Sequence, residues 1–286
     1  MKIISFSGGL GNQLFQYAFY LYLKDNSDFG NIFLDFSFYE SQNKRDAVIR
    51  NFYGVDSLDI IKQSSYVRGK FLILKLINKF RFFNNLLEFV DKENGLDETL
   101  LSTNKVFFDG YWQSYRYVKD YKSNIKELFS FYDFKGNILE VRKKICQSNS
   151  VCMHVRRGDY VAEKNTKLVH GVCSLQYYRD ALNNIKNVDN SIDHIFIFSD
   201  DIDWVKNNIS FDIPVTVVDF VGQSVPDYAE MLLFSCGKHK VIANSTFSWW
   251  GAFLSDRNGV IVSPKKWFAK EEKNYDEIFI EGSLRL

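Results

Sequence analysis

The sequence predicts an α/β fold organised around parallel β-sheet. Short apolar runs of strand character alternate with segments whose apolar residues recur at helical spacing, and this alternation is most regular after residue 150. Strands and helices in that order form a doubly wound sheet. The length of 286 residues fits two compact domains, and the first half of the chain is net basic whereas the second half is net acidic.

The first half begins with an apolar run over 2–7, which we expect to be a buried strand. Glycines follow it, and a helix is then expected from about Asn12, because apolar side chains recur at helical spacing after that point. Another apolar run predicts a strand over 32–36. The stretch 55–130 has mostly helical character, with one further strand expected over 105–109.

The second half predicts a regular series of strands joined by helices. Apolar runs predict strands over residues 151–155, 195–198, 215–218, 241–243 and 260–262. Amphipathic segments predict a helix that Ser174 caps, and helices over 203–207, 227–234 and 247–254. Side chains alternate along a strand, so Met153 and Val155 are expected on one face and His154 on the other. Ligands of such sheets bind beyond the carboxyl ends of the strands, where every unusual polar cluster of this sequence falls.

Composition excludes several classes of protein. A net charge of +1 argues against a nucleic-acid binder that relies on its overall field. Apolar runs such as 71–74 are far shorter than the ~20 residues of a membrane span. The first residues lack a signal-peptide layout, so we expect a soluble, cytoplasmic protein. The four cysteines have neither Cys-x-x-Cys nor zinc spacing, and we expect buried, reduced thiols at Cys146, Cys152, Cys173 and Cys236.

The first polar cluster lies between the first strand and its helix, and it consists of Gly8, Gly9, Gly11, Asn12 and Gln13. Glycines there allow a ligand to approach the backbone, and a helix start favours an anion. The dinucleotide fingerprint would require a glycine where Leu14 stands, so a nicotinamide site is not expected. A tight turn with Asn12 as helix cap remains the alternative.

The second cluster follows strand 151–155 and includes His154, Arg156, Arg157 and Asp159. Two arginines beside a glycine at a strand end suit a diphosphate, because each guanidinium presents a fixed fork of donors and stays charged. An ordinary salt-bridge pair is the alternative.

The third cluster follows strand 195–198 and contains Ser199, Asp200, Asp201 and Asp203. Its carboxylates could hold a divalent metal, accept hydrogen bonds from ribose hydroxyls, or cap the next helix.

The fourth cluster opens the helix 247–254 with small hydrogen-bonding residues that suit a phosphate, namely Asn244, Ser245, Thr246, Phe247 and Ser248. The tryptophans that follow, Trp249 and Trp250, are expected to pack the helix on the sheet rather than to stack on a sugar.

Residues 62–81 carry six basic side chains, no acid and several apolar residues. A surface helix of the first domain and a peripheral contact with a membrane surface are both compatible with this pattern.

Four motifs closely resemble the bacterial α-1,2-fucosyltransferases of glycosyltransferase family 11, and they occur in the expected order at residues 8–17, 154–160, 197–201 and 244–251. Residues 170–174 and 177–178 match as well. The resemblance implies a GT-B-like fold, in which two Rossmann-type domains face a central cleft. We expect an acceptor-side domain over 1–148 and a domain that binds GDP-fucose over 149–286.

The resemblance also implies the reaction. Fucose would pass from GDP-β-L-fucose, with inversion and without an obligatory metal or other cofactor, to the 2-hydroxyl of a terminal β-galactoside. The acceptor would be an O-antigen oligosaccharide, free or on a lipid carrier, at the inner face of the cytoplasmic membrane.

The resemblance assigns Arg156 to the β-phosphate, His154 to the edge of the nucleoside and Glu230 to the guanine. Asn12 and the backbone amides of 245–247 would help to stabilise the departing diphosphate. The base is not evident, and Asp159 and Glu163 are candidates.

Two other functions remain open at this point. One is a metal-dependent glycosyltransferase with another donor that uses Asp200, Asp201 and Asp203. The other is a non-catalytic galactoside-binding module with Trp249 and Trp250 as sugar platforms.

Overall fold

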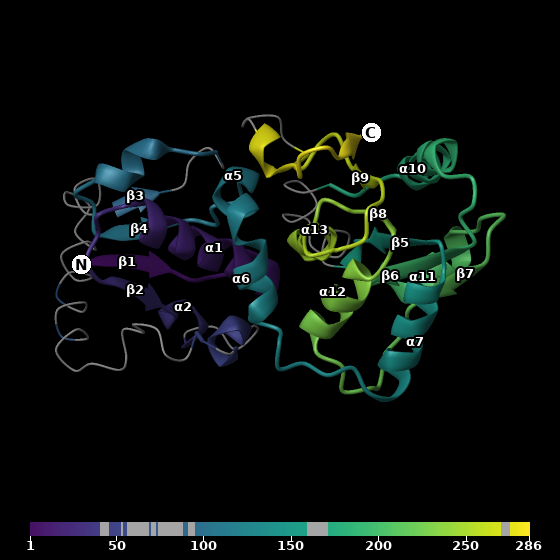
Figure 1. Cartoon of the computed structure of the whole chain (residues 1–286), viewed down its shortest axis with the longest axis horizontal. Coiled ribbons are helices and arrows are strands. Elements are labelled where there is room, and N and C mark those ends of the chain that lie inside the picture. The colour runs from purple at the N-terminus through teal and green to yellow at the C-terminus, as the bar shows by residue number, and fades with distance from the viewer. Residues whose placement is uncertain are drawn as a thin grey trace. The chain divides into compact units, whose positions relative to one another are not determined.

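The computed structural model describes residues 1–40, 46–52, 54–55, 69, 73, 88–90, 95–158, 171–269 and 275–286 (Figure 1). The chain forms two compact units. The first unit comprises Met1–Phe131 and Asn274–Ile278, and the second comprises Tyr132–Lys273 and Phe279–Leu286. Apart from residues 69 and 73, the basic segment 62–81 lies outside the described residues, so its expected membrane contact stays a prediction.

The first unit contains a four-stranded sheet in the order β2-β1-β4-β3, and all of its pairs are parallel. The strands are β1 (Lys2–Ser5), β2 (Ile32–Asp35), β3 (Glu88–Val90) and β4 (Phe107–Asp109). The α-helices are α1 (Leu10–Asn26), α2 (Ser37–Glu40), α5 (Tyr115–Val118) and α6 (Lys122–Glu127). Short 3-10 helices cover Val48–Asn51, Glu98–Ser102, Lys119–Tyr121 and Asp276–Ile278. Aromatic packing joins helix to loop, since the rings of Phe19 and Trp112 stack at 3.9 Å.

The second unit contains a six-stranded sheet in the order β10-β9-β8-β5-β6-β7, again with every pair parallel. The strands are β5 (Ser150–Val155), β6 (His194–Ser199), β7 (Val215–Val217), β8 (His239–Val241), β9 (Ile261–Ser263) and β10 (Leu284–Arg285). The helices are α7 (Gly136–Gln147), α10 (Leu175–Val188), α11 (Ile202–Asn208), α12 (Asp227–Ser235) and α13 (Thr246–Phe253). The parallel sheets confirm the expected α/β class and both Rossmann-type units of the GT-B-like prediction. The cleft between them stays a prediction.

The two faces of β5 are covered by different helices, as its alternation predicts. Met153 and Val155 belong to a core that includes residues of α10 and α11. On the opposite face, the ring of His154 lies against Phe234 of α12 and Phe247 of α13. Ser174 caps α10 as expected, because its side chain accepts a hydrogen bond from the Tyr177 amide.

The division between the units differs from the expected boundary at 148/149. Helix α7 belongs to the second unit, where Arg257 donates to the carbonyl groups of Ile145 and Ser148 at its C-terminal end. Residues 274–278 return to the first unit, because the Glu277 carboxylate accepts hydrogen bonds from the Leu96 amide and the Ser114 hydroxyl.

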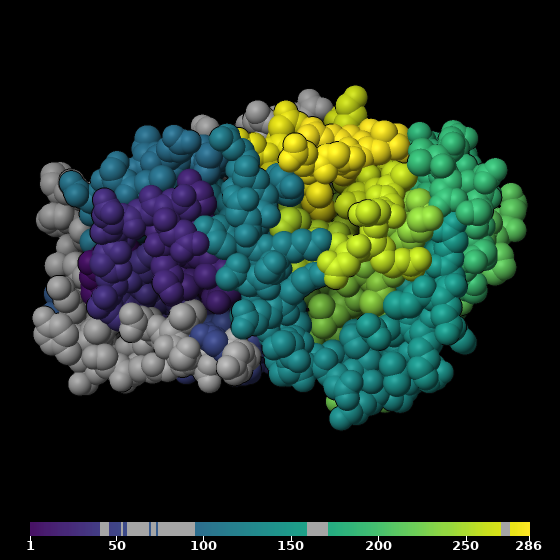
Figure 2. All heavy atoms as spheres, in the orientation of Figure 1, coloured from purple at the N-terminus to yellow at the C-terminus, as the bar shows by residue number. Residues whose placement is uncertain are grey.

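The sequence also gave no signal for β10. It is two residues long, both of them exposed, and it pairs with β9 on the surface of the second unit (Figure 2, yellow).

Candidate functional site

Three neighbouring strands of the second unit direct their carboxyl ends to one edge of the sheet. β5 lies between β6 and β8, and both pairings are parallel. The loop after β5 therefore starts beside the residues that follow β6 and the turn that leads from β8 into α13. Three of the four polar clusters that the sequence predicts meet at this edge.

Arg156 and Asp200 form the central ion pair of the site. Nη1 of Arg156 lies 3.0 Å from Oδ2 of Asp200, and the two side chains are 29% and 24% exposed. The other carboxylate oxygen accepts a hydrogen bond of 2.8 Å from the Arg157 amide. The Asp200 carboxylate thus holds the loop at two points, the side chain of Arg156 and the backbone of Arg157. Both members of the ion pair are partly exposed to solvent, from which a ligand would approach.

Arg157 is fixed in a different way. Its Nε lies 3.4 Å from Oδ2 of Asp201, and its guanidinium stacks 3.7 Å from the Trp204 ring centroid. Asp201 also caps α11 by accepting from the Trp204 amide, which confirms the capping interpretation for this residue. Asp159 and Glu163, the two candidates for the base, lie outside the described residues.

Small side chains allow the loops after β5 and β6 to approach closely. The Ser199 hydroxyl donates to the Val155 carbonyl at 2.8 Å and accepts from the Asp201 amide at 3.0 Å. A Cβ on Gly158 would lie only 2.6 Å from Oδ2 of Asp200. A glycine is therefore required at position 158 for the Asp200 carboxylate to keep its place.

His154 lies beneath this loop and is only 4% exposed. Its Nδ1 has no hydrogen-bond partner among the residues that the structure describes. Burial and the nearby positive charge of Arg156 lower the pKa of His154 to about 3. The imidazole is therefore neutral at ordinary pH, and its Nδ1 is buried.

The turn before α13 is built largely by internal hydrogen bonds. Asn244 is buried, and its Nδ2 donates to the Trp267 carbonyl at 3.3 Å. The Ser248 hydroxyl donates to the Ser245 carbonyl at 3.2 Å. Ser245 is the N-cap of α13, but its side chain makes no capping hydrogen bond. The residues of this turn that a ligand can reach most readily are Thr246 and Phe247, both partly exposed.

Trp249 and Trp250 are fully buried, which confirms that they pack α13 and excludes them as sugar platforms. Glu230 lies on α12 and is partly buried. Burial, followed by the negative charges of Asp227 and Asp219, raises the pKa of Glu230.

The glycine cluster belongs to the first unit, and its turn is tighter than expected. Gly8 has a φ of +82°, which favours glycine. The N-cap of α1 is Gly9, so the alternative in which Asn12 caps the helix is wrong. Asn12 lies in the first turn, and its backbone N–H donates to the Gly9 carbonyl. Gly11 is buried inside the helix.

The side chains of this cluster are also engaged. Gln13 is fully buried, donates to the carbonyls of Gly8 and Asp46, and accepts from the Ile49 amide. The Gln13 side-chain amide therefore holds the turn, and it is not placed to bind a nucleotide-sugar. The Asn12 side chain accepts a hydrogen bond of 2.9 Å from Gln113, a buried residue that the sequence did not point to. The only feature of the sequence that could have indicated Gln113 is its position shortly after the strand predicted over 105–109.

Within the described residues, no group of three or more His, Cys, Asp or Glu side chains is arranged to hold a metal ion. In the same part of the chain, no helix is both long enough and apolar enough for a membrane crossing.

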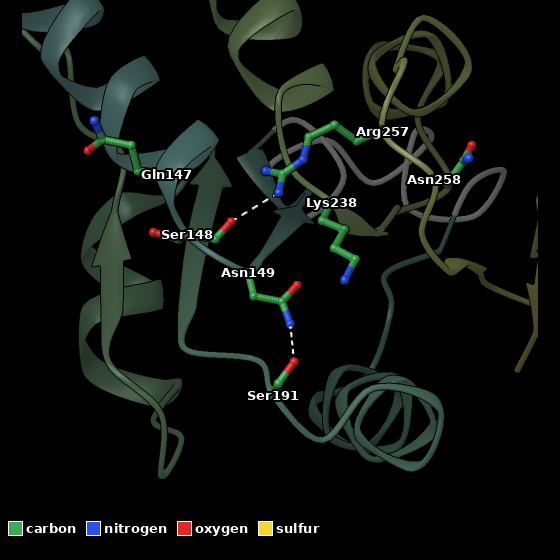
Figure 3. A pocket seen from close by; sticks show the side chains of 7 residues that line it. All are labelled: Gln147, Ser148, Asn149, Ser191, Lys238, Arg257 and Asn258. Atoms are coloured by element: carbon green, nitrogen blue, oxygen red, sulfur yellow. Dashed lines mark hydrogen bonds between the residues drawn. The ribbon is translucent and has the colours of Figure 1, made fainter.

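A pocket exists at the opposite, amino-terminal edge of the second sheet, where Ser148, Lys238 and Arg257 line it (Figure 3). Its cations are already bound: Lys238 pairs with Asp189 at 2.7 Å, and Arg257 donates to backbone carbonyls. The carboxyl edge, where ligands of such sheets bind, is the better candidate site.

The Glycosyl transferase family 11 model matches residues 71–282, which is most of the chain. The chain belongs to this family. It is 32% identical over 279 residues to an α-1,2-colitosyltransferase of Escherichia coli, an alignment that covers 94% of this chain and 92% of the relative. It is 31% identical over 293 residues to an O-antigen biosynthesis glycosyltransferase of the same organism, covering 94% and 95% of the two chains.

Among solved structures, a glycosyl transferase family 9 protein from Veillonella parvula aligns with 99% of this chain and 86% of its own, at a TM-score of 0.47 and 10% identity. That likeness is too low to add to the assignment. Membership of family 11 makes the chain a glycosyltransferase, and the arginine cluster lies within the matched residues.

Proposed function

We propose that this family 11 enzyme transfers L-fucose from GDP-β-L-fucose to the 2-hydroxyl of a terminal β-galactoside, with inversion. The observation that carries the proposal is the Arg156–Asp200 arrangement at the carboxyl edge of the second sheet, within the four motifs that resemble α-1,2-fucosyltransferases. The E. coli relatives support an acceptor in O-antigen synthesis and an α-1,2 linkage.

In this proposal, Arg156 is the main catalytic residue. As the bond between fucose and GDP breaks, negative charge grows on the β-phosphate. A cation there stabilises the transition state more than the bound donor. The carboxylate of Asp200 orients the guanidinium before the donor arrives, so little reorganisation is needed during the reaction.

The resemblance to the family supplies the remaining contacts to the donor in this proposal. His154 would border the nucleoside, and Glu230 would accept from the N–H groups of guanine. The start of α13 would supply backbone N–H groups to the diphosphate at Thr246 and Phe247, which are partly exposed. The role of base stays with Asp159 or Glu163 as a prediction.

GDP-colitose is a second candidate for the donor, and one of the comparisons favours it. One relative is named as a colitosyltransferase, and colitose lacks the 3-hydroxyl of fucose. A site that hydrogen-bonds this hydroxyl would reject the deoxy sugar strongly, whereas an apolar site would discriminate little. Comparing kcat/KM for GDP-fucose and GDP-colitose therefore decides between the two donors.

The test of the proposed function is GDP release from GDP-fucose with a panel of galactosides, followed by linkage analysis of the product. We expect release that depends on the acceptor and a new α-1,2 bond. No release above hydrolysis with any galactoside would contradict the proposal.

Two further measurements address the alternatives. Calorimetry with GDP alone should show binding, which a galactoside-binding module would not give. Activity should persist in excess chelator, whereas loss that added Mg²⁺ restores would favour a metal-dependent enzyme.

A further inference from the structure

Two cysteines at the ends of different helices lie together in the second unit. Cys146 is in the last turn of α7, and Cys236 is the C-cap residue of α12. The Cys146 thiol and the Arg142 guanidinium are neighbours of the Cys236 sulfur that act on its pKa. Ninety residues of chain separate the two positions, so their proximity is a product of the fold.

The backbone around the two thiols is held in place by one side chain. Nη1 of Arg257 lies 3.1 Å from the Ile145 carbonyl oxygen and 3.2 Å from the Cys236 carbonyl oxygen. Nη2 of the same guanidinium donates to the Ser148 carbonyl (Figure 3). Carbonyls at the C-terminal ends of both helices thus converge on Arg257, which also offsets the partial negative charge of these ends.

The two thiols differ in accessibility. Cys146 is exposed, contrary to the expectation of a buried thiol, while Cys236 is partly buried. Burial, followed by Cys146 itself, raises the pKa of Cys236 to about 11. An oxidant in solution would therefore react with Cys146 first. Cys236 is the neighbouring thiol that can react with the oxidised Cys146.

We propose that Cys146 and Cys236 form a redox-active dithiol that peroxides oxidise to a disulfide. The sulfur of Cys146 attacks a peroxide oxygen, so that an S–O bond forms, the O–O bond breaks and a first water leaves. The sulfur of Cys236 then displaces the sulfenic oxygen as a second water, and its proton leaves with that water. The two thiols lose two electrons, which the peroxide accepts.

The disulfide would join the C-terminal ends of α7 and α12. Because α12 also carries Glu230 and Phe234, the bond would fix a helix that borders the donor site. Closing a loop of this length restricts the unfolded chain, so the melting temperature should rise by about 5–10 °C and return on reduction.

The test uses the full-length protein and does not depend on its catalytic activity. Wild type and the variants Cys146→Ser, Cys236→Ser and Cys173→Ser are treated with hydrogen peroxide and mapped by non-reducing peptide mass spectrometry. Cys173 is partly buried and belongs to another part of the fold, so its variant is the matched control. We expect a Cys146–Cys236 peptide and a reversible rise in melting temperature in wild type and Cys173→Ser alone.

A second measurement covers variants that fold poorly. A trivalent arsenical that needs two thiols should bind wild type at one site and protect both cysteines from alkylation. Oxidation of Cys146 to sulfinic acid without the linked peptide would overturn the proposal, as would a bond from Cys236 to the buried Cys152.

Discussion

Replacing Arg156 by alanine is the most direct test of the chemistry proposed here. In the proposed mechanism, the Arg156 guanidinium donates hydrogen bonds to the negative charge that develops on the β-phosphate. Loss of one such hydrogen-bond donor typically lowers kcat by about 10²–10³, or about 2.7–4 kcal/mol. Its ion pair with Asp200 is partly exposed on both sides. A pair of that kind contributes at most about 1 kcal/mol to stability. Arg156→Ala should therefore lose most of its activity and little of its stability.

Part of that loss would come from Asp200 rather than from the missing cation. Without Arg156, the carboxylate keeps its hydrogen bond to the Arg157 amide and stays beside the site with its charge unpaired. The double variant Arg156→Ala/Asp200→Asn removes this repulsion. It should recover up to about tenfold of the rate, or about 1.4 kcal/mol.

The assay is single-turnover GDP release with saturating donor, with circular dichroism melts of each variant. Arg156→Lys is the conservative control, and it should fall between wild type and alanine because a lysine keeps the charge but loses the fork. Arg157→Ala should reduce stability more than rate, since this side chain stacks on Trp204. A near-normal rate for Arg156→Ala would refute the reasoning and shift the phosphate role to Arg157.

Three further predictions concern neighbouring residues. Adding a methyl group with Gly158→Ala should displace Asp200 and lower kcat by about tenfold or more, and an unchanged rate would show that the carboxylate does not position the loop. Glu230→Gln should weaken GDP binding in calorimetry by about 10–100-fold, whereas the exposed Asp227→Asn should have little effect. The folded-state pKa of His154 is lowered to about 3, so the unfolded state binds the proton first as pH falls below about 6.5, and stability is lost in that window. His154→Gln should reduce the dependence of the unfolding free energy on pH by up to about 1.4 kcal/mol per pH unit. Urea unfolding at pH 7 and pH 5 would measure this change.

The second unit was largely predictable because each of its strands is a short apolar run bounded by polar residues. The alternation along β5 also placed His154 opposite Met153 correctly. The first unit was less readable, since α1 starts two residues earlier than Asn12, at Leu10. The backbone turns already at Gly8, where a positive φ depends on local geometry that spacing does not reveal.

Pairings between distant residues could not be predicted from the sequence. The contact of Gln113 with Asn12 spans 101 positions, and that of Arg156 with Asp200 depends on how β5 and β6 align. Helix α7 was missed because only Ile138 and Ile145 are buried on it, too few to give a clear apolar stripe.

The charged side chains of the site that the structure describes balance one another. Asp200 is balanced by Arg156, and Asp201 by Arg157, so these four side chains together carry no net charge. A diphosphate would compete with Asp200 for the Arg156 guanidinium, whose position the carboxylate has already set. Arg157 is also held by Trp204 and would keep its place. Under the proposed function, Arg156 would bind the donor while Arg157 maintains the loop, which is why the two variants should separate rate from stability.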